Sequence, residues 1–162
     1  NLSMDGVSST YNLMRWPFTW ENFDNNLLYF KKHIDQVSIN FTAQILNIHN
    51  LLESIEYANS RTIPIRIETV RRAPWLSWSV LTDNERDIVV GHIQNQMHQA
   101  RLLSNQKYSI IGVLKEIRET KHSPTDRDMF VDKMHKILSL RNYAVDIMPL
   151  FPDLNIRVKN GK

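Results

Sequence analysis

Apolar residues recur at every third or fourth position from Phe23 to Ile55, and this stripe constrains the fold more than any other feature of the sequence. The spacing is that of an α-helix with one buried face. Because the stripe is sustained over about five heptads, it predicts one helix from about residue 20 to about residue 57, roughly 57 Å long. A break is most expected at Ser38–Asn40, which are indifferent helix formers. The stripe consists of Phe23, Leu27, Phe30, Ile34, Val37, Phe41, Ile45, Ile48, Leu52 and Ile55.

A second long helix is predicted from residue 82 to about residue 121. Thr82 and Glu85 have the spacing of a capping box, which satisfies free amide groups at a helix start. The apolar stripe lapses at Ser104–Lys107, where we expect a kink or a register shift. Its members are Val89, Ile93, Met97, Ala100, Leu103, Ile110, Leu114 and Ile117.

A third helix is predicted to begin after Ser123 and to stop before Pro149. A serine cap followed by Pro124 is a strong start signal, because proline fits the first helical position. The connection to the preceding helix is short, which favours antiparallel neighbours.

The connection between the first two helices contains a strand-like segment. Ile63, Ile65 and Ile67 alternate with other residues at a period of two, as in a short strand. Pro64 lacks an amide donor and restricts this segment to a sheet edge or an extended loop.

Together these elements predict an all-α protein, an elongated antiparallel helical bundle with two long helices, a third helix and an irregular basic and aromatic connection. Residues 1–18 are expected to form an irregular arm packed on the body, residues 19–148 the bundle domain, and residues 149–162 a C-terminal tail. No apolar run is long enough for a membrane span. The absence of a signal-peptide pattern leads us to expect an intracellular protein, cytoplasmic or nuclear.

The sequence contains no recognisable catalytic or metal-binding motif. No cysteine is present, which excludes thiolate nucleophiles and thiolate zinc sites. The six histidines include no His-Glu-x-x-His pattern, and the chain has no Gly-x-Ser-x-Gly or Walker-type loop. We therefore predict no catalytic residues, no cofactor and no metal.

The strongest candidate for a binding site is a basic and aromatic segment, which lies between the first two predicted helices. Its arginines suit phosphate oxygens, and exposed tryptophans can stack on unpaired bases. In one alternative the tryptophans are buried at the end of the bundle and the arginines form ion pairs with nearby acids. In another the arginines bind an acidic protein surface. The candidate residues are Arg61, Arg66, Arg71, Arg72, Trp75 and Trp78, and the pairing acids would be Glu53, Glu56, Glu68 or Asp83.

These features favour a non-enzymatic interaction or structural module, a fragment or subunit of a larger assembly. It would contact a protein partner, or copies of itself, through long helix faces of coiled-coil type. Apolar residues off the stripes either widen the core-facing surface or form that interface; they are Leu28, Tyr29, Leu46, Leu51, Leu102 and Ile111. The alternative is a nucleic-acid (RNA) binding module of a viral or ribonucleoprotein assembly that uses residues 61–78.

Overall fold

A parallel three-stranded sheet lies at the centre of the fold, in the order β1-β2-β3. The computed structural model describes residues 1–141, with strands β1 (Leu2–Ser3), β2 (Ile39–Ala43) and β3 (Ile65–Thr69). The prediction of an all-α antiparallel bundle is therefore wrong. Because the strands are parallel, their carboxyl ends lie at one edge of the sheet.

The predicted helix over residues 20–57 is four separate elements. Helix α2 (Trp20–His33) leads into β2, and the short turn η1 (Ile48–Asn50) leads into α3 (Leu51–Ser60). The prediction failed because the apolar residues around β2 also follow the two-residue period of a strand. From residue 37 to residue 43 every other residue is apolar and two of them are β-branched, which suits a strand. These alternating apolar residues are Val37, Ile39, Phe41 and Ala43.

The predicted second helix is also divided. Helix α4 (Asp83–Gln99) and helix α5 (Ser104–Glu119) are separated where the stripe lapses, so the expected kink is a complete break. The capping box at Thr82 is confirmed. The turn between the two helices is held by Asn59, whose amide donates to the Arg101 carbonyl at 3.2 Å and accepts from Gln106 Nε2 at 2.7 Å.

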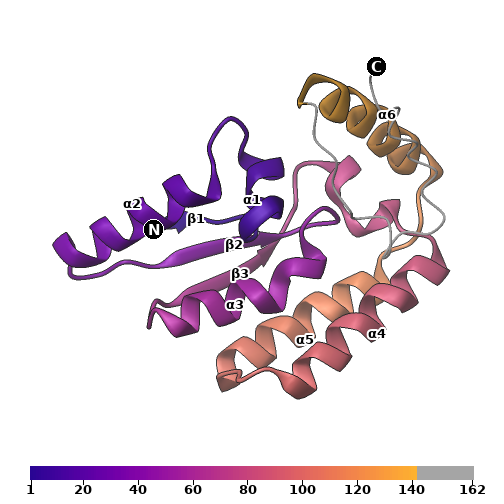
Figure 1. Ribbon diagram of the computed structural model, residues 1–162. Coiled ribbons are helices and arrows are strands. Elements are labelled where there is room, and N and C mark those ends of the chain that lie inside the picture. Colours follow the sequence, from indigo (N-terminus) through magenta and orange to yellow (C-terminus); the bar gives the residue numbers. More distant parts are fainter. Residues whose placement is uncertain (142–162) are drawn as a thin grey trace.

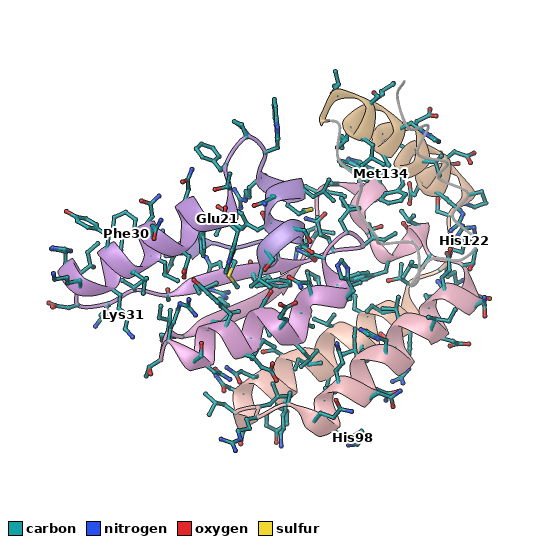
Figure 2. The ribbon with its side chains drawn as sticks, in the orientation of Figure 1. Glu21, Phe30, Lys31, His98, His122 and Met134 are labelled. Carbon is teal, nitrogen blue, oxygen red and sulfur yellow. The ribbon has the colours of Figure 1, made fainter. Side chains whose placement is uncertain are left out.

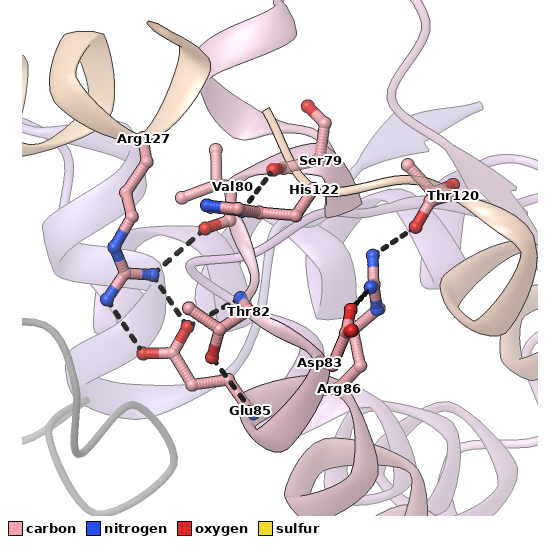
Figure 3. Close-up of polar contacts among 9 residues, drawn as sticks. All are labelled: Ser79, Val80, Thr82, Asp83, Glu85, Arg86, Thr120, His122 and Arg127. Atoms are coloured by element: carbon pink, nitrogen blue, oxygen red, sulfur yellow. Dashed lines mark hydrogen bonds and ion pairs between the residues drawn. The ribbon is translucent and has the colours of Figure 1, made fainter. Parts of the chain in front are cut away.

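Helix α6 (Pro124–Arg141) starts as predicted, with Ser123 Oγ accepting from the Asp126 amide at 3.2 Å. Its predicted end near residue 148 lies outside the described residues, as does the predicted tail. The helix is anchored through Arg127, which binds Glu85 on α4 and the Val80 carbonyl (Figure 3).

The first 18 residues, expected to be irregular, contain β1 and the helix α1 (Ser8–Arg15). They contribute the buried side chains of Met4, Val7, Tyr11 and Leu13 to the protein interior. Two short turns, η2 (Pro74–Leu76) and η3 (Trp78–Val80), connect β3 to α4.

Helices α2 and α3 lie side by side, joined by a ring contact between Trp20 and Tyr57 with centroids 4.6 Å apart. Figure 1 shows α4 and α5 as an antiparallel pair beside α3, and α6 apart from them above the η2–η3 segment. One face of β2 is buried in the core, whereas Arg66 and Glu68 on β3 point to the exposed face. Within residues 1–141, no helix has both the length and the apolar character that a membrane crossing requires.

Candidate functional site

Three loops leave the carboxyl edge of the sheet, where open parallel sheets bind their ligands. They follow β1 at residues 4–7, β2 at residues 44–47 and β3 at residues 70–73. The first two are closed by internal hydrogen bonds, whereas the third exposes charged side chains.

Two buried asparagines tie the first two loops together. Asn47 Nδ2 donates to the carbonyls of Asp5 at 3.3 Å and Thr42 at 3.0 Å. Asn50 Oδ1 accepts from the Val7 amide at 2.5 Å. The Val7 amide and the Asp5 and Thr42 carbonyls are thus occupied by side chains of the same protein.

The loop after β1 leaves no room above its glycine. Gly6 has a φ of +131°, and a Cβ there would lie 2.6 Å from Thr10 Cγ2 and 2.9 Å from Asn50 Oδ1. The strand–loop–helix arrangement that holds phosphate in other proteins is therefore filled here by the chain's own side chains.

A buried acid–base cluster lies below this loop. Asp5 binds Arg15 at 2.5 Å; burial raises the pKa of Asp5, and the Arg15 charge opposes that shift. Thr10 Oγ1 and His49 Nε2 are 3.3 Å apart, and burial, helped by the charge of His92, lowers the pKa of His49 to about 4.

The arrangement of Thr10 and His49 resembles a nucleophile and its base, but the third member is missing. His49 Nδ1 has no hydrogen-bond partner among residues 1–141, so no carboxylate orients the imidazole. No group of three potential metal ligands occurs in the same part of the chain. Sequence reasoning missed this cluster because it treated residues 1–18 as irregular; the Asp-Gly step before Ser-Ser-Thr was the available turn signal.

The third loop presents two cations. Arg71 and Arg72 directly follow Val70, whose amide donates to the Ala43 carbonyl at 3.1 Å and so fixes the loop to the end of β2. Both arginine side chains are exposed, and neither forms an ion pair with a residue in the described part of the chain.

Trp75 follows these arginines and lies next to α6. The segment folds back over the sheet edge, because the Ile45 amide donates to the Leu76 carbonyl at 3.1 Å. Trp75 is partly exposed, and Lys133 Nζ lies 5.2 Å from the centre of its ring. An exposed contact of this type contributes about 0.5–1 kcal/mol. We call Arg71, Arg72, Trp75 and Lys133 the basic surface.

The other predicted site residues lie elsewhere. Arg61 binds Asp24 at 2.8 Å and stacks on the ring of Tyr57 at 3.8 Å, which joins α2 to α3. Arg66 pairs with Glu68 at 2.8 Å on the exposed sheet face. Trp78 is a core residue with 1% of its surface exposed. Of the six candidates, Arg71, Arg72 and Trp75 are partly or fully exposed and lie in the connection that follows β3.

The apolar residues off the stripes fall into two groups. Leu46 and Leu51 are buried and Leu102 packs partly buried against the core, whereas Leu28 and Tyr29 on α2 and Ile111 on α5 are exposed. Figure 2 shows Phe30 and Lys31 at the end of α2 far from Met134 on α6, so the exposed part of α2 is distant from the basic surface.

The histidines do not cluster into a site of their own. Figure 2 places His98 near the carboxyl end of α4 and His122 at the opposite end of that helix. His122 Nδ1 lies 3.1 Å from the Ser79 carbonyl, beside the start of α6. Comparison with protein-family models, curated proteins and solved structures gave no match.

Proposed function

We propose that the protein binds nucleic acid through the basic surface, with Arg71 and Arg72 holding backbone phosphates. The observation that carries this proposal is the exposure of two adjacent guanidinium groups at the carboxyl edge of the sheet, unpaired within residues 1–141. Adjacent like charges repel each other and are stabilised by an anion between them. Guanidinium groups match phosphate oxygens in shape and charge.

A polymer suits this surface better than a small anion. Both guanidinium groups are exposed to solvent, so a single phosphate would be bound in a high dielectric and weakly. A polynucleotide gains from several phosphates in parallel and from counterion release. The expectation of a helical interaction module rested on continuous long helices, which the chain does not form.

The test is fluorescence anisotropy with a labelled single-stranded RNA at about 50 and about 200 mM salt. Two phosphate contacts contribute about 1.4 to the slope of log affinity against log salt. Arg71→Ala/Arg72→Ala should flatten the slope by that amount and weaken binding about tenfold at the lower salt concentration.

The matched control is Arg66→Ala/Arg101→Ala, which removes the same charge from exposed positions outside the basic surface. We expect this control to bind nearly as well as the wild type. An equal loss in both double variants would mean diffuse charge attraction and would overturn the site. Binding of labelled polyglutamate without binding of RNA would assign the arginines to an acidic protein partner instead.

A further inference from the structure

We infer that the basic surface selects unpaired strands, because a base can stack on the indole of Trp75 between the arginine pair and Lys133. This inference rests on the proposed function and specifies the class of nucleic acid that the same site takes. Two observations support it: Trp75 and Trp78 differ in burial, and Lys133 on α6 lies next to Trp75.

Trp75 is partly exposed, and backbone constraints flank it on both sides. Pro74 fixes the start of η2, and the Ile45–Leu76 backbone bond fixes its end. Trp78, three residues later, is 1% exposed and fills the core. The core therefore encloses Trp78 completely, whereas Trp75 packs against the core with part of its surface exposed.

The group that contacts the Trp75 ring is one that a base can replace. Lys133 Nζ lies 5.2 Å from the centre of the Trp75 ring. Within residues 1–141, no aromatic ring stacks on Trp75. Stacking of a base on an aromatic ring is stronger than an exposed lysine–ring contact. The displaced ammonium stays close enough to bind the phosphate next to the stacked base.

The residues one helical turn from Lys133 on α6 include no acid. Residues three and four positions away share its face of the helix. These neighbours are Met129, Phe130, Lys136 and Ile137. Lys136 is exposed, so a second cation lies one helical turn from Lys133.

A duplex cannot use this arrangement fully. Arg72 and Trp75 are three residues apart, at most about 11 Å along the chain. A single strand can therefore place a phosphate at the arginine and a nearby base on the indole. Paired bases are stacked within the double helix, so a duplex offers only its backbone phosphates to the protein. A duplex would therefore bind through the salt-dependent phosphate contacts and without base stacking.

The experiment compares three labelled ligands of equal length: a single-stranded RNA, its duplex, and an abasic strand that lacks bases. Trp75→Leu removes the aromatic face, Trp75→Phe retains part of it, and Trp16→Leu is the control at an exposed tryptophan outside the basic surface. Trp75→Leu should weaken single-strand binding by about fivefold to about a hundredfold. Binding of the duplex and abasic strand should not change, and Trp75→Phe should recover part of the loss.

Equal affinity of the wild type for the abasic and base-bearing strands would overturn the inference, as would unchanged single-strand binding by Trp75→Leu. The Arg71 and Arg72 dependence would still support the proposed function in either case. Loss of that dependence, or no RNA binding by the wild type, would overturn the proposed function itself. If Trp75→Leu does not fold, Trp75→Phe replaces it and should weaken binding of the single strand without changing binding of the abasic strand.

Discussion

Glu85 in the first turn of α4 and Arg127 in the first turn of α6 form a bidentate ion pair between residues 42 positions apart in sequence. The two nitrogen–oxygen distances are 2.6 and 3.1 Å, and the Glu85 side chain is completely buried. Glu85 also accepts from the Thr82 amide, as Figure 3 shows, so one carboxylate caps α4 and anchors α6. This anchor sets the position of α6 and therefore of Lys133 over Trp75.

Removal of the charge at Glu85 should destabilise the protein strongly. Glu85→Gln keeps an oxygen for the helix cap but leaves the largely buried Arg127 without its counterion, which costs about 3–5 kcal/mol. Urea unfolding followed by circular dichroism measures this loss. The control is Glu119→Gln, which breaks the exposed 3.8 Å pair with Lys115 and should cost less than about 1 kcal/mol. Similar losses in both variants would show that the buried pair has no special role.

Two glycine-to-alanine substitutions should have opposite effects on stability. Gly6→Ala places a methyl group against Thr10 and Asn50 at a φ of +131°, and we expect a loss of about 2 kcal/mol or more. Gly112→Ala lies in α5 with nothing within 4 Å, so higher helix propensity should stabilise the protein by about 0.5–1 kcal/mol. Thermal unfolding of both variants measures these two effects. A Gly6→Ala variant more stable than the wild type would contradict the close packing around Gly6.

His49 should make stability depend on pH in the acidic range. Its pKa is about 4 in the folded protein and 6.5 in the reference state, so the unfolded chain binds the extra proton between these values. The stability contributed by neutral His49 is therefore complete above pH 6.5 and decreases as pH falls toward 4, by at most about 1.4 kcal/mol per pH unit. The raised pKa of Asp5 acts in the opposite direction near the lower limit.

The contribution of His49 is isolated by comparing the wild type with His49→Gln. Unfolding free energies between about pH 7 and about pH 4 should decrease less in the variant. Parallel curves for the two proteins would mean that His49 is protonated as easily in the folded state as in the unfolded state.

Arg61 should be structural and not part of the nucleic-acid interface. Arg61→Ala loses the 2.8 Å pair with Asp24 and the stacking on Tyr57, and we expect a destabilisation of about 1–2 kcal/mol. The affinity of the folded variant for single-stranded RNA should match that of the wild type. A tenfold weaker affinity with unchanged stability would extend the interface to the other end of the segment 61–78.

The sequence by itself determined the features that depend on neighbouring residues. The starts of α4 and α6 follow from Thr82, Glu85, Ser123 and Pro124, because a cap needs only the first turn of its own helix. The presence of a strand within residues 63–67 follows from the alternating isoleucines, although β3 begins at Ile65, after Ile63 and Pro64. The stripe also identified core positions, although they belong to several elements.

The tertiary structure decided the features that depend on distant pairing. Residues 37–43 fit both a helical and a strand period, and β2 is a strand because β1 and β3 hydrogen-bond to its two sides. The arginines and tryptophans of residues 61–78 look alike in sequence, but their surroundings differ. Asp24 binds Arg61, the core encloses Trp78, and α6 brings Lys133 to Trp75. These partners lie far away in the chain, so local spacing could not distinguish a structural arginine from an exposed one.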